Sequence, residues 1–292
     1  MKVVKAEYAG ACYGVQRALD LAYRAAQEGE PTCTLGPLIH NPQVVAQLRE
    51  AGVGAVDSVE DIPGGTMVVR SHGVVPEVIE RARERGLRIV DATCPHVARA
   101  QKAAAHMARK GRFVVVVGEA GHPEVEGICA HARAAAHRAQ DAASGEECAV
   151  AAVVDADQLP ASVLRPGARV GVVVQTTQSR EVFERVVSAL EERGVDVEVK
   201  DTVCTATRQR QDAAAALAGN VDAFVVIGGR NSSNTTRLHE ICKALCARSY
   251  HIESADELDA AWFDGCETVG VTAGASTPED QIATVIARLE RL

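Results

Sequence analysis

The chain has 292 residues, which is enough for two or three domains that each bury a core. The hydrophobic fraction of 47% argues against disorder, and the formal net charge of −8 argues against a nucleic-acid-binding protein, which usually carries a basic face. No stretch reaches the roughly 18 apolar residues of a membrane span, and the N-terminus lacks an apolar signal-peptide core. We therefore expect a cytoplasmic protein that binds neither nucleic acid nor membrane.

Short apolar strands alternate with helices along the whole chain. The first third is expected to contain strands at 2–8, 32–35, 67–70 and 87–90, and helices at 13–27, 43–51 and 76–85. The middle third is expected to contain strands at 113–117, 149–154, 170–174 and 195–199, helices at 95–109 and 180–192, a polar loop at 118–127 and a polar turn at 144–147. The last third is expected to contain strands at 223–227 and 268–271, a polar loop at 228–236, and helices at 205–218, 237–247 and 279–289.

A cysteine that follows a strand and begins a helix occurs three times, at Cys12, Cys94 and Cys204. The same offset of 28 residues separates these cysteines from His40, His122 and Ser232, each of which lies in a polar loop. A fixed offset that recurs three times indicates an internal repeat.

Alternating strands and helices are typical of parallel sheets with helices on both faces. We predict an α/β protein with three pseudo-equivalent domains, at 12–93, 94–203 and 204–292, arranged around a central cavity with approximate three-fold symmetry. No strand follows the last helix, so we expect residues 1–11 to complete the third domain. Ligands of such sheets bind beyond the carboxyl ends of the strands, where the cysteines and polar loops occur.

Three cysteines from three domains form a trigonal ligand set for a metal. Helix N-termini favour the thiolate form, which suits either zinc or an iron–sulfur cluster, and the spacing does not choose between them. The other cysteines are expected to be small, buried, apolar residues. They are Cys33, Cys129, Cys148, Cys242, Cys246 and Cys266.

The loops are rich in hydrogen-bond donors and nearly free of lysine and arginine, and together with glycines they suit a phosphate or diphosphate. The donors are His40, His72, His122, Ser232, Ser233, Asn234 and Ser276. Glu124 is the acidic side chain beside His122, and it is either a proton donor or a helix-capping residue. Thr176 and Thr177 follow a strand and need have no chemical role.

Eight stretches of the chain, in order, closely resemble the 4-hydroxy-3-methylbut-2-enyl diphosphate reductase family, also called IspH/LytB. The stretches are Ala11-Cys12-Tyr13-Gly14-Val15, His40-Asn41-Pro42, Ser71-His72-Gly73-Val74, Asp91-Ala92-Thr93-Cys94-Pro95, Gly121-His122-Pro123-Glu124-Val125-Glu126-Gly127, Gln175-Thr176-Thr177, Asn231-Ser232-Ser233-Asn234 and Thr272-Ala273-Gly274-Ala275-Ser276. The resemblance covers nearly the whole chain and departs from the family at no functional position.

The resemblance implies one [4Fe–4S] cluster per chain on Cys12, Cys94 and Cys204, with its fourth iron facing the substrate hydroxyl. It implies that Glu124 supplies protons and that Thr176 touches the substrate hydroxyl. It also implies that His40, His72, His122, Ser232, Ser233, Asn234 and Ser276 hold the diphosphate. The implied reaction is a two-electron reductive dehydroxylation that yields isopentenyl and dimethylallyl diphosphates, the last step of the methylerythritol phosphate pathway. A flavodoxin or a ferredoxin is the implied electron donor.

The residues by themselves are also compatible with two other functions. Quinolinate synthase resembles this plan, with three repeated α/β domains and a three-cysteine cluster, but its carboxylate substrates would favour arginine forks, which these loops lack. A zinc-stabilised binding protein for a phosphorylated ligand is the alternative from another class. Iron would make anaerobically purified protein brown, whereas zinc would leave it colourless.

Overall fold

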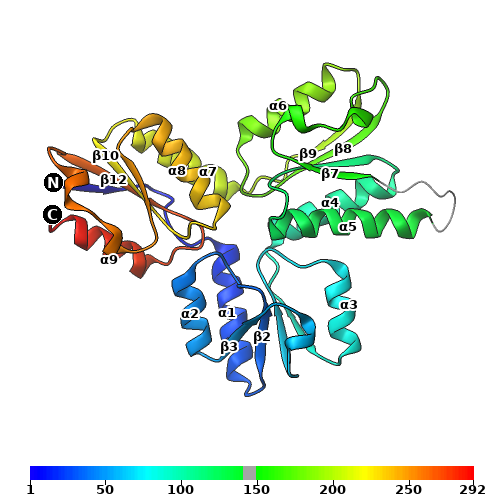
Figure 1. Cartoon of the computed structure of the whole chain (residues 1–292), viewed down its shortest axis with the longest axis horizontal. Helices are drawn as coiled ribbons and strands as arrows, with labels where there is room; N and C mark the ends of the chain where they lie inside the picture. Colours follow the sequence, from blue (N-terminus) through cyan, green and yellow to red (C-terminus); the bar gives the residue numbers. More distant parts are fainter. Residues whose placement is uncertain (141–148) are drawn as a thin grey trace. The chain divides into compact units, whose positions relative to one another are not determined.

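The structure is a computed structural model that describes residues 1–140 and 149–292. Within these residues the strands form three parallel sheets of four strands each, flanked by helices (Figure 1). The predicted fold class, an α/β protein built from parallel sheets, is therefore confirmed. The chain divides into two compact units. Unit 1 comprises Met1–Gln16, Ile39–Gln47 and Cys204–Leu292, and unit 2 comprises Arg17–Leu38 and Leu48–Val203.

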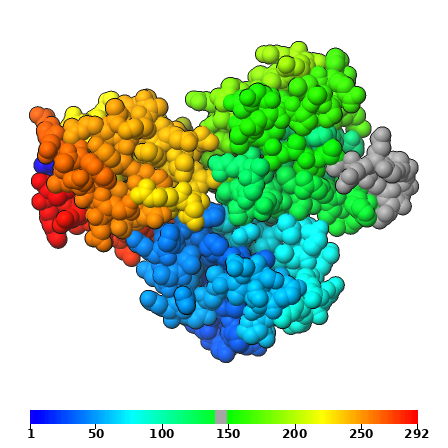
Figure 2. Space-filling model, viewed as in Figure 1, coloured from blue at the N-terminus to red at the C-terminus, as the bar shows by residue number. Residues whose placement is uncertain are grey.

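Unit 1 contains one sheet with the strand order β1-β12-β10-β11. Its strands are β1 (Lys2–Lys5), β10 (Ala223–Ile227), β11 (Ser249–Ile252) and β12 (Thr268–Ala273), and its helices are α7 (Thr205–Ala218), α8 (Ser233–Leu245), α9 (Glu279–Leu289) and the 3₁₀ turns η4 (Ala255–Glu257) and η5 (Ala260–Phe263). β1 pairs in parallel with β12, with Lys2 opposite Thr268. The N-terminal strand thus completes the sheet built by the C-terminal residues, as predicted, and part of its blue segment is visible between the orange and red segments in Figure 2.

Unit 2 contains two sheets, with the strand orders β3-β2-β4-β5 and β7-β6-β8-β9. The first sheet consists of β2 (Thr32–Leu35), β3 (Val53–Val56), β4 (Thr66–Val69) and β5 (Arg88–Asp91), with α3 (Pro76–Glu84) and η1 (Val59–Asp61). The second consists of β6 (Phe113–Val117), β7 (Val150–Val153), β8 (Arg169–Val174) and β9 (Asp196–Lys200), with α4 (Pro95–Arg109), α5 (Pro123–Gln140), α6 (Arg180–Glu191), η2 (Ala156–Gln158) and η3 (Ala161–Val163). Helices α1 (Tyr13–Gln27) and α2 (Pro42–Glu50) cross the boundaries between the units.

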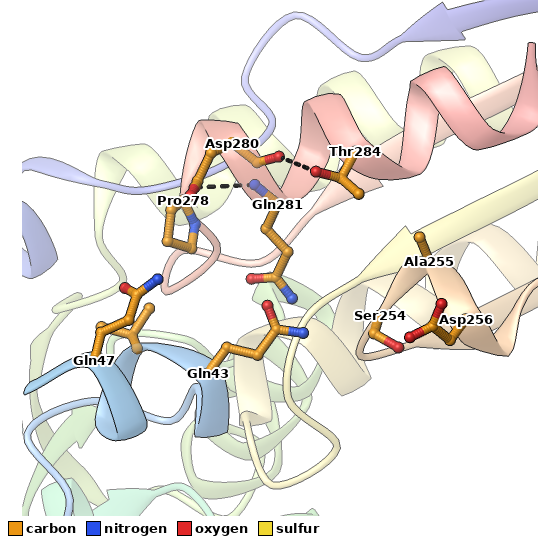
Figure 3. A pocket seen from close by; sticks show the side chains of 10 residues that line it. Gln43, Gln47, Ser254, Ala255, Asp256, Pro278, Asp280, Gln281 and Thr284 are labelled. Atoms are coloured by element: carbon orange, nitrogen blue, oxygen red, sulfur yellow. Dashed lines mark hydrogen bonds between the residues drawn. The ribbon is translucent and has the colours of Figure 1, made fainter. Parts of the chain in front are cut away.

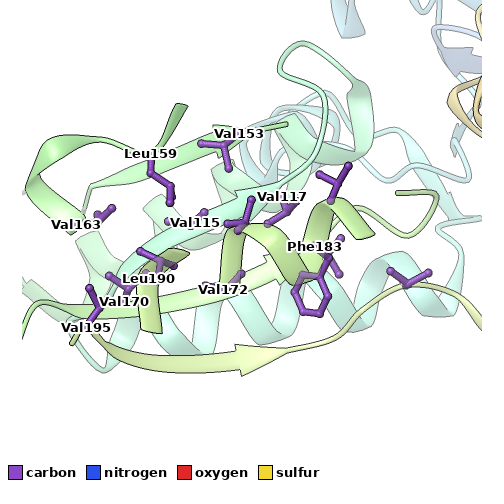
Figure 4. Packing of buried hydrophobic residues seen from close by; sticks show 14 residues of the cluster. Val115, Val117, Val153, Leu159, Val163, Val170, Val172, Phe183, Leu190 and Val195 are labelled. Atoms are coloured by element: carbon purple, nitrogen blue, oxygen red, sulfur yellow. The ribbon is translucent and has the colours of Figure 1, made fainter. Parts of the chain in front are cut away.

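The second sheet of unit 2 is buried on both faces, which explains its continuous valine runs. Val115 and Val117 point to one face, where they pack with Phe183 of α6 (Figure 4). Val114 and Val116 point to the other face, against the alanine-rich helices α4 and α5, which lie side by side (Figure 1). All four valines have no exposed surface. Burying one such side chain contributes about 1.5–3 kcal/mol, so this double-sided core fixes the sheet edge at which the polar loops begin.

Several predicted elements were wrong in extent. α8 begins at Ser233, so the end of the predicted loop at 228–236 is helical. α5 was not predicted as a helix, and its first turn lies within the predicted loop at 118–127. The reason is that serine, asparagine, proline and acidic residues suit a first helical turn as well as a loop. Strands β3 and β11 were missed because their sequences, Val-Gly-Ala-Val and Ser-Tyr-His-Ile, lack a continuous run of large apolar residues. The predicted polar turn at 144–147 lies outside the described residues.

The eight cysteines within the described residues are all thiols and form no disulfides. Cys33, Cys129, Cys242 and Cys246 are buried, as predicted. Cys266 is half-buried at the edge of the unit 1 core, so the prediction of full burial was wrong for this residue. Cys148 lies outside the described residues. Among the helices that the structure describes, none has the length and apolar character needed to cross a membrane.

Candidate functional site

The carboxyl of Glu124 and the backbone and hydroxyl of Thr176 form a buried hydrogen-bonded pair in unit 2. Glu124 lies in the first turn of α5 and is only 2% exposed, and Thr176 follows the end of β8. The Thr176 N–H donates to Oε1 of Glu124 at 2.7 Å, and the Thr176 hydroxyl donates to Oε2 at 2.8 Å. The carboxyl therefore hydrogen-bonds across to the neighbouring strand end and does not cap its own helix.

Burial raises the pKa of Glu124 to about 7, with a further contribution from the nearby Glu119 carboxylate, while the two hydrogen bonds from Thr176 oppose the rise. An ordinary glutamic acid has a pKa of 4.5 and is almost fully charged at neutral pH. A carboxyl with a pKa near 7 can both hold and release a proton under these conditions, which is the property of a general acid.

The side chain of Gln175 holds the loop that precedes Glu124, at a point where Gly118 allows a close approach. The Oε1 of Gln175 accepts a hydrogen bond from the Glu119 N–H at 2.9 Å, and its amide donates to the Thr177 hydroxyl at 3.1 Å. A Cβ at Gly118 would lie 2.8 Å from the Gln175 side chain, so only glycine allows this approach. The strand ends of β6 and β8 are thereby fixed against each other beside Glu124.

His122 lies two residues before Glu124, and its ring is held neutral. Burial, together with the charge of the nearby Arg70 guanidinium, lowers the pKa of His122 to about 4. Nδ1 of His122 accepts a hydrogen bond from the Glu124 N–H at 3.1 Å, so the single proton of the neutral ring is on Nε2. The ring can therefore donate one hydrogen bond from Nε2. His72 lies edge-on to it, with ring centroids 5.5 Å apart.

Arg70 is a functional candidate that the sequence reasoning missed. It was assigned to the end of a strand, but β4 ends at Val69, and Arg70 is the first residue of the loop that carries His72. Its Nε donates to the Gly73 carbonyl at 3.3 Å, and its charge acts on Glu126 and His122. The loop after β4 therefore carries one arginine in addition to the donors named from the sequence.

Each of the three repeated cysteines directly precedes a helix, as predicted. In unit 2, Cys94 is the N-cap residue of α4, and its N–H donates to the Ser71 carbonyl at 2.9 Å. In unit 1, Cys204 is the N-cap residue of α7, and Cys12 precedes α1 with its sulfur 3.5 Å from the Val15 N–H. All three are half-buried. The side chains of Cys94 and Cys204 make no capping hydrogen bond to their helices.

Unit 1 brings the predicted serine, asparagine and His40 loops together. Ser232 caps α8 by accepting a hydrogen bond from the Thr235 N–H at 3.4 Å, and the Ser276 hydroxyl donates to the His40 carbonyl at 3.0 Å. Ser233 begins α8 and is half-buried. The prediction that a serine in such a loop is often a helix cap thus applies to Ser232, whose hydroxyl proton can still be donated.

Asn234 has a buried amide that the described part of the chain does not satisfy. It is 4% exposed, and neither its Nδ2 nor its Oδ1 has a hydrogen-bond partner there. Next to it, a Cβ at Gly274 would clash with the Thr235 hydroxyl, so glycine is required for the two loops to meet. An unsatisfied buried amide costs about 1–3 kcal/mol, which a bound polar ligand can recover.

Two cavities among the described residues lie apart from the predicted site residues. One of about 230 Å³ in unit 1 lies between α2, η4 and the start of α9, where Gln43 and Gln281 face each other (Figure 3). Both of their amides donate to the Glu253 carbonyl. The other, of about 440 Å³ in unit 2, includes Gln101 and His131 in its lining.

The fold and these loops define an α/β protein whose imidazole, hydroxyl, amide and thiol groups gather at strand ends and helix starts. A family model described as "LytB protein" matches residues 3–290. A protein of Geobacter sulfurreducens named 4-hydroxy-3-methylbut-2-enyl diphosphate reductase is 48% identical over 290 residues, which are 99% of this chain and 97% of that protein. One of the same name from Geobacter sp. strain M21 is 46% identical over 293 residues, 100% of this chain and 98% of the relative. The chain therefore belongs to the LytB family of 4-hydroxy-3-methylbut-2-enyl diphosphate reductases.

Solved structures agree with this assignment. A structure of (E)-4-hydroxy-3-methyl-but-2-enyl diphosphate reductase, described as the terminal enzyme of the non-mevalonate pathway, is 40% identical, with a TM-score of 0.70 and full coverage of both chains. The Plasmodium falciparum reductase is 23% identical, with a TM-score of 0.87 and coverage of 98% of this chain and 87% of its own, and it supports the fold alone. The family assignment also decides against quinolinate synthase.

Proposed function

We propose that the protein reduces (E)-4-hydroxy-3-methylbut-2-enyl diphosphate to isopentenyl and dimethylallyl diphosphates, the last step of the methylerythritol phosphate pathway. The reaction adds two electrons and two protons to the substrate, breaks its carbon–hydroxyl bond and releases water. The observation that carries the proposal is the buried Glu124–Thr176 pair, because the reaction needs a proton source and the pKa of Glu124 is raised to about 7. Family membership supports the same reaction.

The electrons require a redox cofactor, and three cysteines fit a [4Fe–4S] cluster. Cys12, Cys94 and Cys204 would hold it, one cluster per chain, because each of the three thiols is half-buried at the start of a helix. When bound, the cluster supplies electrons one at a time. A flavodoxin or ferredoxin would deliver those electrons.

The diphosphate would be held by His40, His72, His122, Ser232, Ser233, Asn234 and Ser276. The unsatisfied amide of Asn234 supports this role, because a buried donor without a partner is expected where a ligand supplies one. The neutral ring of His122 supports it as well, since its Nε2–H can donate to a phosphate oxygen. Arg70 adds a positive charge near His122.

Glu124 would donate a proton to the leaving hydroxyl, and Thr176 would orient that hydroxyl. The Thr176 hydroxyl bonds to Glu124, so one residue can connect the acid to the substrate. The hydrogen bonds from Thr176 also stabilise the carboxylate that forms after the proton leaves.

The experiment is anaerobic purification with iron analysis, followed by turnover of the substrate with a chemical reductant. We expect a brown protein with about four irons per chain that forms both products. Cys204→Ser should lose the iron, whereas the matched variant Cys266→Ser, at a half-buried cysteine outside the repeat, should keep it. A colourless, zinc-containing protein without turnover would refute the proposal and favour a zinc-stabilised binding protein.

A further inference from the structure

Arg210 is a buried arginine that connects two of the proposed cluster-binding segments in unit 1. It lies in α7 and is 6% exposed. Its Nε and one terminal nitrogen donate to the Gly10 carbonyl at 3.1 and 2.7 Å, and its other terminal nitrogen donates to the Ala206 carbonyl at 2.8 Å. Gly10 is two residues before Cys12, and Ala206 is two residues after Cys204. One guanidinium thus connects the backbone just before Cys12 to the backbone just after Cys204.

The charge of Arg210 has no carboxylate partner in the described part of the chain. Its hydrogen bonds go to carbonyl oxygens, and the ionisable groups that act on it are the thiols of Cys12 and Cys204. Burial lowers the pKa of Arg210 and the two thiols oppose this, but an arginine remains protonated in proteins. A buried charge without a counter-charge is costly, so a negative group is expected where these thiols lie.

We propose that Arg210 is a positioning residue for the cluster: it braces the Cys12 and Cys204 segments and supplies a positive charge that raises the cluster's reduction potential. This inference rests on the proposed function, which assigns both cysteines to the cluster. Reduction adds one electron and hence one negative charge to a centre already bound by thiolates. A fixed positive charge nearby stabilises the reduced form more than the oxidised form, so it makes the cluster easier to reduce.

The test compares the holoenzyme with the variants Arg210→Gln, Arg210→Lys and Arg291→Gln. Glutamine removes the charge, and lysine keeps the charge but cannot reproduce the guanidinium's bonds to both carbonyls. Arg291 is exposed at the end of the chain and controls for a change of one charge in the same unit. The measurements are iron per chain and a redox titration of the cluster followed by electron paramagnetic resonance.

In Arg210→Gln we expect the ratio of reduced to oxidised cluster at a fixed solution potential to fall by about tenfold, which is about 59 mV for one electron. Arg210→Lys should keep a potential near that of the wild type with faster loss of iron, and Arg291→Gln should match the wild type in both. If Arg210→Gln releases its cluster while Arg210→Lys keeps four irons at the wild-type potential, the charge is again supported.

An unchanged potential in Arg210→Gln with full iron content would overturn the inference. Loss of the cluster from both Arg210 variants would also overturn the electrostatic assignment, because packing alone would then explain the residue. A wild-type protein that binds no iron would instead refute the proposed function, so the two failures are distinguishable.

Discussion

Replacing Glu124 with glutamine removes the ionisable proton from the candidate acid while keeping its shape. The amide oxygen can still accept from the Thr176 N–H, and the amide NH₂ can donate to the Thr176 hydroxyl once that hydroxyl rotates. The variant should therefore fold and bind substrate. We expect kcat to fall by a factor of about 10²–10³ and KM to change by less than about threefold.

The expected loss is that of a general acid, whose removal typically costs about 10²–10⁴ in rate, and burial is what keeps this acid partly protonated at neutral pH. With a pKa of about 7, roughly half of the Glu124 side chains carry a proton at pH 7. At the ordinary glutamic acid pKa of 4.5, only about one side chain in 300 would be protonated, so burial raises the population of the acid form by more than about 100-fold. A loss of this size in kcat corresponds to about 3 kcal/mol of activation free energy.

The pH dependence gives a second measure of the same role. The acid must be protonated, so the wild-type kcat should fall about tenfold per pH unit above its pKa of about 7. Glu124→Gln should lack this alkaline limb. Thr176→Val removes one hydrogen bond that lowers the pKa of Glu124, so its alkaline limb should move to higher pH.

The assay is anaerobic turnover with reduced methyl viologen from about pH 6 to 9, with iron content checked for each variant. The reasoning is refuted if Glu124→Gln keeps kcat within about threefold of the wild type at full iron content. It is also refuted if the alkaline limb persists in that variant, because another group would then be the acid.

The other predictions concern affinity, packing and stability. Asn234→Ala should weaken diphosphate binding, measured by calorimetry, by about 10- to 150-fold. It should not lower Tm, because the amide has no partner among the described residues. A large fall in Tm with unchanged affinity would contradict this prediction. Gly274→Ala should lower the unfolding free energy by about 1–3 kcal/mol, because the new Cβ meets the Thr235 hydroxyl. The control Gly219→Ala has open space around the new Cβ and should not lower the unfolding free energy. Equal effects of the two substitutions would refute the packing argument. In urea unfolding, Glu124→Gln should be more stable than the wild type by roughly 3 kcal/mol at pH 8 and equally stable near pH 4. The reason is that the raised pKa of Glu124 in the folded protein makes the wild type lose unfolding free energy as the pH rises from about 4.5 to 7. A stability difference that stays constant with pH would exclude this linkage.

Local pattern was enough to predict most strands and most helices. The valine run at Phe113–Val117 and the alanine-rich run at Pro95–Arg109 were assigned with their observed limits, because each is bounded by glycine, proline or polar residues that end an element. The repeat also predicted that the N-terminal strand joins the last sheet, since an unpaired strand edge needs a partner. Helix starts were harder, because the residues that cap a helix also form loops, as at Ser233 and Pro123.

The sequence also determined the candidate chemistry, because residue types and their spacing are local information: Cys12, Cys94 and Cys204 each precede a helix at the expected place. Only the tertiary structure decided whether Glu124 caps its helix or holds a titratable proton, because its pKa depends on burial and on Thr176, 52 positions away in the chain. The same is true of Arg210, which the sequence reasoning passed over. Its charge becomes significant only because folding brings Gly10, 200 positions away, within hydrogen-bond distance and withdraws the guanidinium from water.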